Sequence, residues 1–317
     1  MKKLIALLLV VTMLCACANG SASSAPAADS SAGSSAAAEA EEETTELIDA
    51  DGLVKDFFAK TDSVLTDTAF ANGGFPQLSD PDADAPRVRI STTAGDITLV
   101  LYPEAAPLAV ENFLTHCRNG YYDGSLFHRV IADFMIQSGI PKEGDGDSIF
   151  GGPFRNEQND RLRHFTGALS MANAGPNTNT CQFFIVQGSA PVDEADLDTL
   201  MLNWYYNEIN TRLYSYDFSA SSDQEMEVLF EKLNELLPEA QENGLPAEVL
   251  ARYQPAAEEY LQHGGSPLLD YGYTVFGQVT EGMDVVDAIA TAETTTNASG
   301  EKSVPVDPVM IVSTEVL

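Results

Sequence analysis

The sequence predicts a mainly β fold, a barrel of short strands capped by two helices and interrupted by an α-helical insertion. Three observations support this prediction. Short apolar runs bounded by Gly, Pro, Asn or Asp recur from residue 87 to the end of the chain. Two segments, 107–117 and 283–290, have helical spacing instead. Residues 191–264 read as acidic helices rather than as strands.

The strands begin with a hairpin. Val88 and Ile90 alternate with polar residues, and so do Ile97, Leu99 and Leu101 after a turn at residues 94–96. The later strand candidates share short length and flanking turn residues, and they are 126–131, 134–137, 168–172, 182–187, 274–279 and 309–316.

The first helix candidate carries Ala109, Phe113 and Cys117 on one face, with Pro107 near its start. Cys117 is therefore expected to be a small buried hydrophobe rather than a reactive thiol. The second candidate, 283–290, follows a Thr-Glu-Gly turn. These two helices are expected to pack on the barrel.

The insertion holds 16 acidic and three basic residues between positions 191 and 264, a net charge of −13. Ser222 and Glu225 form a capping box at the start of its second helix. Pro246 is expected to open a third helix that Pro255 interrupts. The apolar stripes of these helices are expected to face a core more often than a partner.

The N-terminus has the features of a targeting signal. Two lysines precede an apolar run of eleven residues, 4–14, which is too short to span a bilayer. The run ends in Leu14-Cys15-Ala16-Cys17, which resembles the bacterial lipobox and makes Cys17 the expected lipidation site. Cys15 fits less well because bulky Leu14 precedes it. The alternative is an ordinary secretory peptide cut near Ala18.

The chain divides into four predicted regions. Residues 1–16 are a lipoprotein signal peptide, and residues 17–45 are a disordered Ala/Ser/Gly/Glu tether. Residues 46–85 form an N-terminal extension with one helix at 53–70, and residues 86–317 form the domain with its insertion. This division predicts a protein anchored to the cell membrane by a lipid on Cys17, on the extracytoplasmic side.

Charge and metal-ligand spacing exclude some classes of function. Acidic residues outnumber basic ones 48 to 16, for a net charge of −32, which argues against nucleic acid as a partner. The four histidines have no ligand spacing, so neither a metal nor another cofactor is expected. His128 is accordingly expected to be structural rather than a metal ligand or a general base.

Two stretches carry a resemblance, FHRVIADFMIQSG at 127–139 and SMANAGPNTNTCQFFI at 170–185. Together they resemble the cyclophilin family of peptidyl-prolyl cis–trans isomerases. A third stretch, YTVFGQVTEGMDVVD at 273–287, is similar to the family's late strand and helix. Each stretch alone is an ordinary strand or turn, and their co-occurrence in this order carries the identification.

The resemblance implies an eight-stranded antiparallel barrel with a proline pocket on its outside. It implies that Arg129 is catalytic, with Phe134 and Gln137 beside it. It also implies a set of residues that bind the peptide, namely Met135, Ala172, Asn173, Gln182, Phe184, Leu269 and Tyr273. The expected partners are proline-containing polypeptides, exported proteins whose folding the enzyme assists.

Two positions depart from the family. Leu268 stands where many members have a tryptophan that helps bind cyclosporin, and Tyr273 stands where many have a histidine. These departures bear on drug sensitivity and substrate preference more than on catalysis. Two rival hypotheses stay open, a binding module that uses the groove or the insertion, and a solute-binding lipoprotein.

Overall fold

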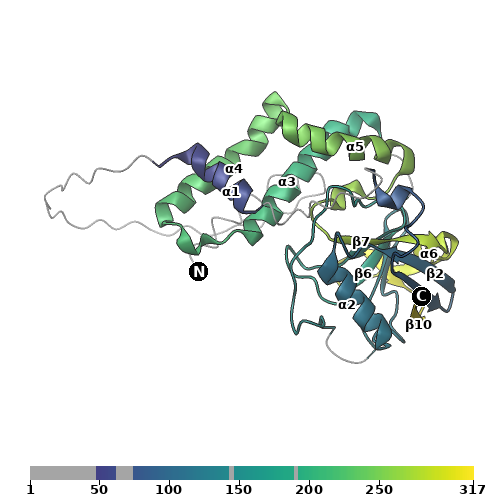
Figure 1. Ribbon diagram of the computed structural model, residues 1–317. Helices are drawn as coiled ribbons and strands as arrows, with labels where there is room; N and C mark the ends of the chain where they lie inside the picture. The colour runs from purple at the N-terminus through teal and green to yellow at the C-terminus, as the bar shows by residue number, and fades with distance from the viewer. Residues whose placement is uncertain (1–47, 62–73, 143–145, 189–191) are drawn as a thin grey trace, which may run out of the picture.

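The computed structural model describes residues 48–61, 74–142, 146–188 and 192–317. Figure 1 shows two neighbouring parts, a β-sheet with helices α2 and α6 beside it and a helical part that contains α1, α3, α4 and α5. The predicted signal peptide and tether, including Cys15 and Cys17, lie outside the described residues. No helix within the described ranges is long and apolar enough to cross a membrane.

Eight strands form one antiparallel sheet in the order β10-β1-β2-β7-β5-β6-β4-β3. Their bounds are β1 Arg87–Thr92, β2 Gly95–Leu101, β3 Arg129–Ile131, β4 Met135–Ser138, β5 Ala168–Met171, β6 Phe183–Val186, β7 Val275–Glu281 and β10 Ile311–Val316. All the pairings are antiparallel. An isolated bridge between Leu126 and Met310 joins the segments that precede the two edge strands. The predicted strand number and antiparallel arrangement are confirmed.

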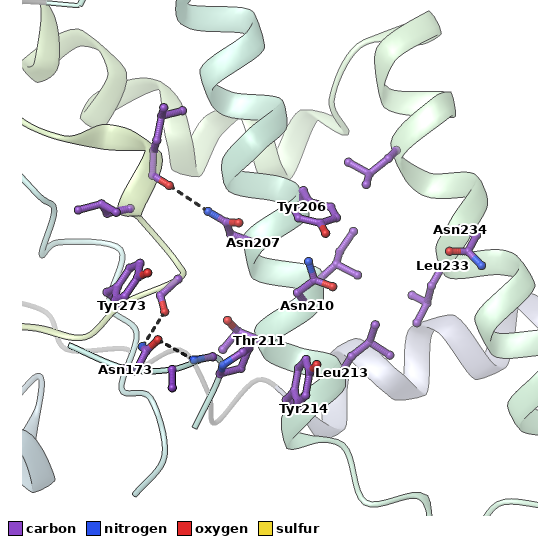
Figure 2. Close-up of a pocket in the computed structure, with 18 of the residues that line it drawn as sticks. Asn173, Tyr206, Asn207, Asn210, Thr211, Leu213, Tyr214, Leu233, Asn234 and Tyr273 are labelled. Atoms are coloured by element: carbon purple, nitrogen blue, oxygen red, sulfur yellow. Dashed lines mark hydrogen bonds between the residues drawn. The ribbon is translucent and has the colours of Figure 1, made fainter. Parts of the chain in front are cut away.

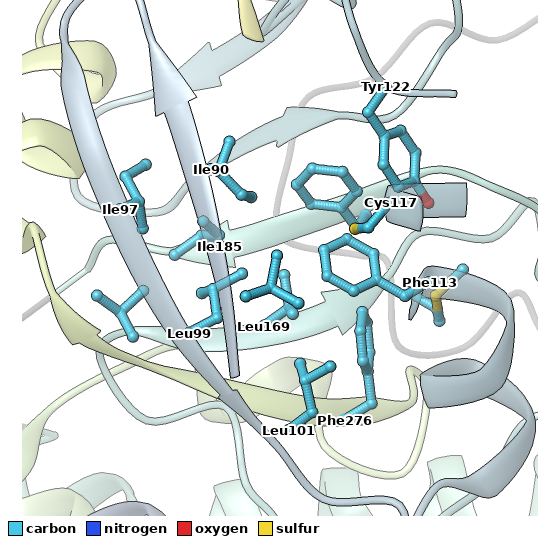
Figure 3. Close-up of a cluster of buried hydrophobic side chains, with 14 of the residues drawn as sticks. Ile90, Ile97, Leu99, Leu101, Phe113, Cys117, Tyr122, Leu169, Ile185 and Phe276 are labelled. Carbon is cyan, nitrogen blue, oxygen red and sulfur yellow. The ribbon is translucent and has the colours of Figure 1, made fainter. Parts of the chain in front are cut away.

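The core of the sheet is built from the alternating residues of the strands together with α2 (Pro107–Arg118) and α6 (Met283–Ala290). Figure 3 shows Leu99 and Ile185 from the sheet packing near Phe113 of α2. Cys117 lies in the same cluster, as predicted, and burial raises the pKa of its thiol to about 12. A fully buried thiol with that pKa is inert at neutral pH.

The insertion consists of three helices, α3 Leu197–Ser215, α4 Asp223–Asn243 and α5 Ala247–His263. They share a second hydrophobic core with α1 (Ala50–Lys60), which comes from the N-terminal extension. Trp204 and Tyr260 are fully buried there, and Phe57 of α1 packs with them in the same cluster. Helix α1 and the insertion therefore form one packed unit, although α1 ends at Lys60 and α3 begins only at Leu197.

Several boundaries differ from the predictions. Helix α1 ends at Lys60 instead of continuing to residue 70, and residues 62–73 lie outside the described part. Pro255 does not interrupt α5, because the burial of Tyr253 and Tyr260 on the same helix offsets the lost backbone hydrogen bond. The capping box at Ser222 is confirmed.

One element was not predicted at all. Strands β8 (Thr294–Thr296) and β9 (Lys302–Pro305) form a separate two-stranded hairpin after α6. These strands are short, and in β9 Ser303 is buried while Val304 is exposed, so they lack the apolar pattern by which the other strands were found. The hairpin lies against β3 and brings one carboxylate to the site described below.

Candidate active site

The β3–β4 hairpin places the predicted catalytic arginine. Arg129 lies directly opposite Gln137 in the antiparallel register, so their side chains share one face. The turn between the strands carries Asp133 at φ 59° and then Phe134. The side-chain carbonyl of Gln187 accepts a hydrogen bond from the Asp133 backbone N–H at 2.7 Å. This contact fixes the turn and thereby the position of Phe134.

Strand β6 supplies the next residues. Phe184 lies opposite Gln137 in the β4–β6 pairing and is only 4% exposed. The Gln137 amide donates to the side chain of Gln182 at 3.1 Å, and Gln182 accepts the Ala172 backbone N–H through its own carbonyl at 2.9 Å. Two stretches about forty residues apart in sequence are thus joined side by side.

Nine of the ten predicted residues line one pocket of about 100 Å³. They are Arg129, Phe134, Met135, Gln137, Ala172, Asn173, Phe184, Leu269 and Tyr273. Gln182 is the tenth, and it lies behind Gln137 rather than in the lining. The pocket therefore has apolar walls with one cation and a few amides at its edge.

The Arg129 guanidinium is held from two sides. Its Nε and Nη2 donate to the two carboxylate oxygens of Glu301 at 2.8 and 2.7 Å. Its Nη1 is 3.4 Å from the side-chain oxygen of Gln137 and 3.8 Å from the sulfur of Met135. Nη1 is therefore the donor on the side of the pocket, because both of these neighbours line it.

Glu301 comes from the loop between β8 and β9, and the sequence offered no signal for its role. The facing Arg129 guanidinium lowers the pKa of this carboxyl to about 2. The same hydrogen bonds raise the pKa of the guanidinium. Both groups are therefore charged throughout the physiological pH range.

Aromatic packing shapes the floor of the pocket. Tyr273 meets Phe184 edge to face, with ring centroids 5.6 Å apart and planes at 88°. On another side, His164 stacks on Phe184 at 5.9 Å. His164 is buried, and its Nδ1 is 2.7 Å from a carboxylate oxygen of Asp270. The other Asp270 oxygen accepts the hydroxyl of Tyr260 at 2.9 Å.

This chain of contacts links the insertion to the pocket, because Tyr260 belongs to α5. The sequence indicated no metal-binding role for the four histidines, His164 among them, and no role for Asp270. Asp270 directly follows Leu269 in the sequence, and no motif distinguishes it from the other aspartates of the chain. The structure gives both residues a buried supporting role.

Helix α3 also holds the loop 267–272, which leads into Tyr273. Three of its side chains donate hydrogen bonds to loop carbonyls: Trp204 to Pro267 at 2.7 Å, Asn207 to Asp270 at 2.9 Å and Thr211 to Tyr271 at 2.8 Å. The loop carries Leu269, and Asn173 donates to its Gly272 carbonyl at 3.2 Å. The insertion is therefore part of the frame of the pocket.

Other candidate groups have no visible chemistry. His128 is half-buried beside Arg129, and burial lowers the pKa of its imidazole. Among the described residues, no group of His, Cys, Asp and Glu is arranged to hold a metal. Cys181 is buried and burial raises the pKa of its thiol, so this thiol is expected to be inert rather than redox-active.

Comparison with known proteins finds relatives of one kind, the peptidyl-prolyl cis-trans isomerases. The model of the cyclophilin-type peptidyl-prolyl cis-trans isomerases matches residues 87–202 and 256–316. The gap between these ranges falls within the helical insertion. A relative from Staphylococcus haemolyticus, described as a "Putative peptidyl-prolyl cis-trans isomerase", is 38% identical over 76% of this chain and 97% of its own.

A relative from Streptococcus pyogenes is described as a "Putative bifunctional phosphatase/peptidyl-prolyl cis-trans isomerase" and is 38% identical over 76% of this chain. The match covers 41% of that longer protein. Among solved structures, a cyclophilin-type isomerase of Cryptosporidium parvum is 22% identical, with a TM-score of 0.45, and aligns with 74% of this chain and 98% of its own.

The antiparallel sheet carries a surface pocket with apolar walls and one guanidinium at its edge. The chain belongs to the cyclophilin-type peptidyl-prolyl cis-trans isomerases.

Proposed function

We propose that Arg129 catalyses rotation about Xaa-Pro bonds by donating a hydrogen bond to the twisted amide. The barrier to this rotation is about 20 kcal/mol, and it reflects lost amide resonance. Twisting leaves the proline nitrogen pyramidal with a lone pair, which a planar amide lacks. A donor directed at that lone pair stabilises the transition state more than the ground state. The observation that carries this assignment is Nη1 of Arg129 directed to the pocket side.

The pocket walls then have a separate role. Phe134, Met135, Phe184 and Leu269 surround the proline ring with apolar surface, so the ring stays fixed while the carbonyl side rotates. Water excluded by these walls no longer screens the guanidinium, which strengthens its interaction with the lone pair. No nucleophile, metal or cofactor is needed for such a rotation.

The peptide backbone needs groups that both donate and accept. Gln137 and Gln182 provide side-chain amides of this kind, and they are already hydrogen-bonded to each other. Ala172 and Asn173 contribute backbone groups along the pocket edge, and Tyr273 lies across from them. These residues keep the Xaa-Pro bond aligned with Arg129.

A protease-coupled assay on a proline-containing peptide tests the assignment. Arg129→Ala removes the donor, and the expected fall in kcat is about 100-fold, as for the loss of one donor to a developing charge. Arg89→Ala is the matched control, because it breaks only the surface pair with Glu315. Equal rates for wild type and Arg129→Ala would exclude this residue as the catalytic group.

The place of action belongs to the same proposal. The basic start, the short apolar run and the Leu-Cys-Ala-Cys sequence support lipidation of Cys17 and export. The enzyme then assists the folding of exported proteins at the outer side of the membrane. Incorporation of labelled fatty acid is expected to disappear in Cys17→Ser and to persist in Cys15→Ser. Label retained in Cys17→Ser contradicts the anchor.

A binding module is the second candidate, and the cavity between α3 and α4 favours it. In that case the protein holds clients and isomerisation is incidental. Deletion of residues 192–263 is a poor test, because α3 and α5 support the loop 267–272 and the floor of the pocket. A better test is client refolding with Arg129→Ala, which a pure binding module tolerates without loss.

A further inference from the structure

A second, larger cavity borders the proline pocket. It measures about 600 Å³ and runs across α3, between the loops of the β-sheet domain and α4 (Figure 2). Asn173, Leu269 and Tyr273 line both cavities. The two spaces therefore adjoin at these three residues. We call the larger one the α3–α4 groove.

The lining of the α3–α4 groove is uncharged, although the insertion is the most acidic part of the domain. Its apolar side chains include Leu213 of α3 and Leu233 and Leu237 of α4. Between them lie the amides of Asn210 and Asn234. Apolar surface with interspersed amides suits an extended polypeptide, since an amide can both donate to and accept from a peptide backbone.

Two asparagines of α3 line the groove and differ in what their side chains contact. Asn207 uses its amide on the carbonyls of Leu268 and Asp270, so it supports the loop wall. The side chain of Asn210, almost one turn further on, makes no hydrogen bond within the described ranges and points into the groove (Figure 2). Its amide is available to a ligand. Leu268 stands at the edge with 65% of its surface exposed.

We propose that the α3–α4 groove binds the segment of a client polypeptide that flanks the proline. This inference rests on the proposed function, because it assumes that a proline occupies the neighbouring pocket. The ligand is an extended, uncharged segment with apolar side chains. A segment rich in Asp or Glu is disfavoured, because α4 carries exposed carboxylates such as Glu231 and Glu235 close to the lining residues.

The continuity of the two cavities favours this occupant. A polypeptide held under Arg129 must leave the proline pocket along its rim, and one rim is formed by Asn173, Leu269 and Tyr273. Beyond that rim lies the α3–α4 groove rather than open solvent. Once the proline is bound, the flanking residues of the client are already next to this uncovered apolar surface. Their contact with it therefore costs no further translational entropy.

The test uses peptides that share one Ala-Pro-Phe centre. The short peptide has four residues, the extended peptide adds uncharged apolar residues on both sides, and a third peptide adds Asp instead. Wild type is expected to process the extended peptide with a kcat/KM roughly 3- to 10-fold above that of the short one, the effect of about one net hydrogen bond. The Asp-flanked peptide is expected to lack this advantage.

Asn210→Asp keeps the size of the side chain but places a charge in the groove, and it should abolish the advantage while leaving the short peptide unaffected. Leu237→Glu provides a second variant if the first folds poorly. Asn243→Asp is the control, since Asn243 is exposed at the end of α4 and outside the lining. Retention of the advantage in both groove variants overturns the inference.

The outcomes for the two proposals differ. If wild type processes the short and extended peptides equally well, the groove inference is wrong and the isomerase assignment stands. If wild type accelerates neither peptide, the proposed function itself fails. A groove variant that slows both peptides by the same factor also overturns the inference, because the groove then affects catalysis without contacting the flank.

Discussion

Replacement of Glu301 by alanine tests how the guanidinium of Arg129 is positioned. The carboxylate holds Nε and Nη2 at 2.8 and 2.7 Å, so Nη1 remains for the pocket. Without it, the remaining anchor is the 3.4 Å contact with Gln137. The arginine then samples more rotamers, and a smaller fraction of molecules has the donor in place.

The size of the effect follows from side-chain entropy. Complete ordering of an arginine costs about 2 kcal/mol, and each 1.4 kcal/mol is tenfold in rate. The loss in kcat is therefore at most about 30-fold, and we expect roughly 3- to 10-fold because Gln137 still restrains the guanidinium. Removal of the negative charge acts in the opposite direction by strengthening the field of Arg129. That gain is small, because the two side chains are 32% and 36% exposed and water screens them.

The assay is steady-state isomerisation of one peptide with separate kcat and KM values. Glu301→Ala should lower kcat and leave KM nearly unchanged, whereas Glu301→Gln should recover part of the rate by keeping one acceptor. Glu315→Gln is the control, because it breaks a surface pair with Arg89 that lies on other strands. If both Glu301 variants are faster than wild type, the carboxylate restrains catalysis and the positioning argument is refuted.

Three further predictions concern pH and stability. The Glu301 carboxyl should titrate near pH 2 by NMR rather than near its usual value of 4.5, so its stabilising effect is complete above about pH 4.5 and is lost as the pH falls toward 2. A midpoint near 4.5 would show that the ion pair does not form. Tyr260→Phe should lower the free energy of unfolding by about 1–3 kcal/mol in urea, because it removes a hydrogen bond from a buried carboxylate oxygen whose other partner, Nε of Arg163, is 3.9 Å away. An unchanged unfolding midpoint would show that this contact between α5 and Asp270 does not stabilise the protein. Gly188→Ala should cost about 1–3 kcal/mol and lower kcat, since its Cβ would lie 2.7 Å from the Asp133 carbonyl, whereas Gly152→Ala meets nothing within 4 Å and should behave as wild type. Equal behaviour of the two alanine variants would mean that the turn before Phe134 tolerates displacement.

The role of the insertion bears on how the family fold is used here. In this chain the loop that carries Leu269 is held by α3, and the packing behind Phe184 ends in Tyr260 of α5. The acidic helices are therefore not an independent appendage. The loss of one buried contact between them and the sheet is expected to alter the pocket as well as the stability.

Local sequence was enough to find the sheet and most of the site. Period-two alternation marked the first hairpin, and short apolar runs between turn residues marked the later strands. The β3–β4 and β6 residues of the site lie in two compact stretches, so their order along the chain carried the pattern. Seven of the nine predicted residues that line the pocket lie in these two stretches, and Leu269 and Tyr273 come from the segment that follows the insertion.

Contacts between residues far apart in the sequence could not be predicted from these local patterns. Glu301 lies 172 residues from Arg129, on a short hairpin whose sequence has no apolar run or apolar alternation. The packing of α1 with α3–α5 depends on the apolar face of each helix. The sequence of one helix shows that it has such a face but does not show which other helix covers it. The sequence by itself determined the strand pattern and, through its resemblance to a family, most of the residues that line the pocket. Only the tertiary structure decided which carboxylate holds Arg129 and which helices support the pocket, because hydrogen bonds and packing between distant segments depend on their positions in space and leave no periodic trace in the chain.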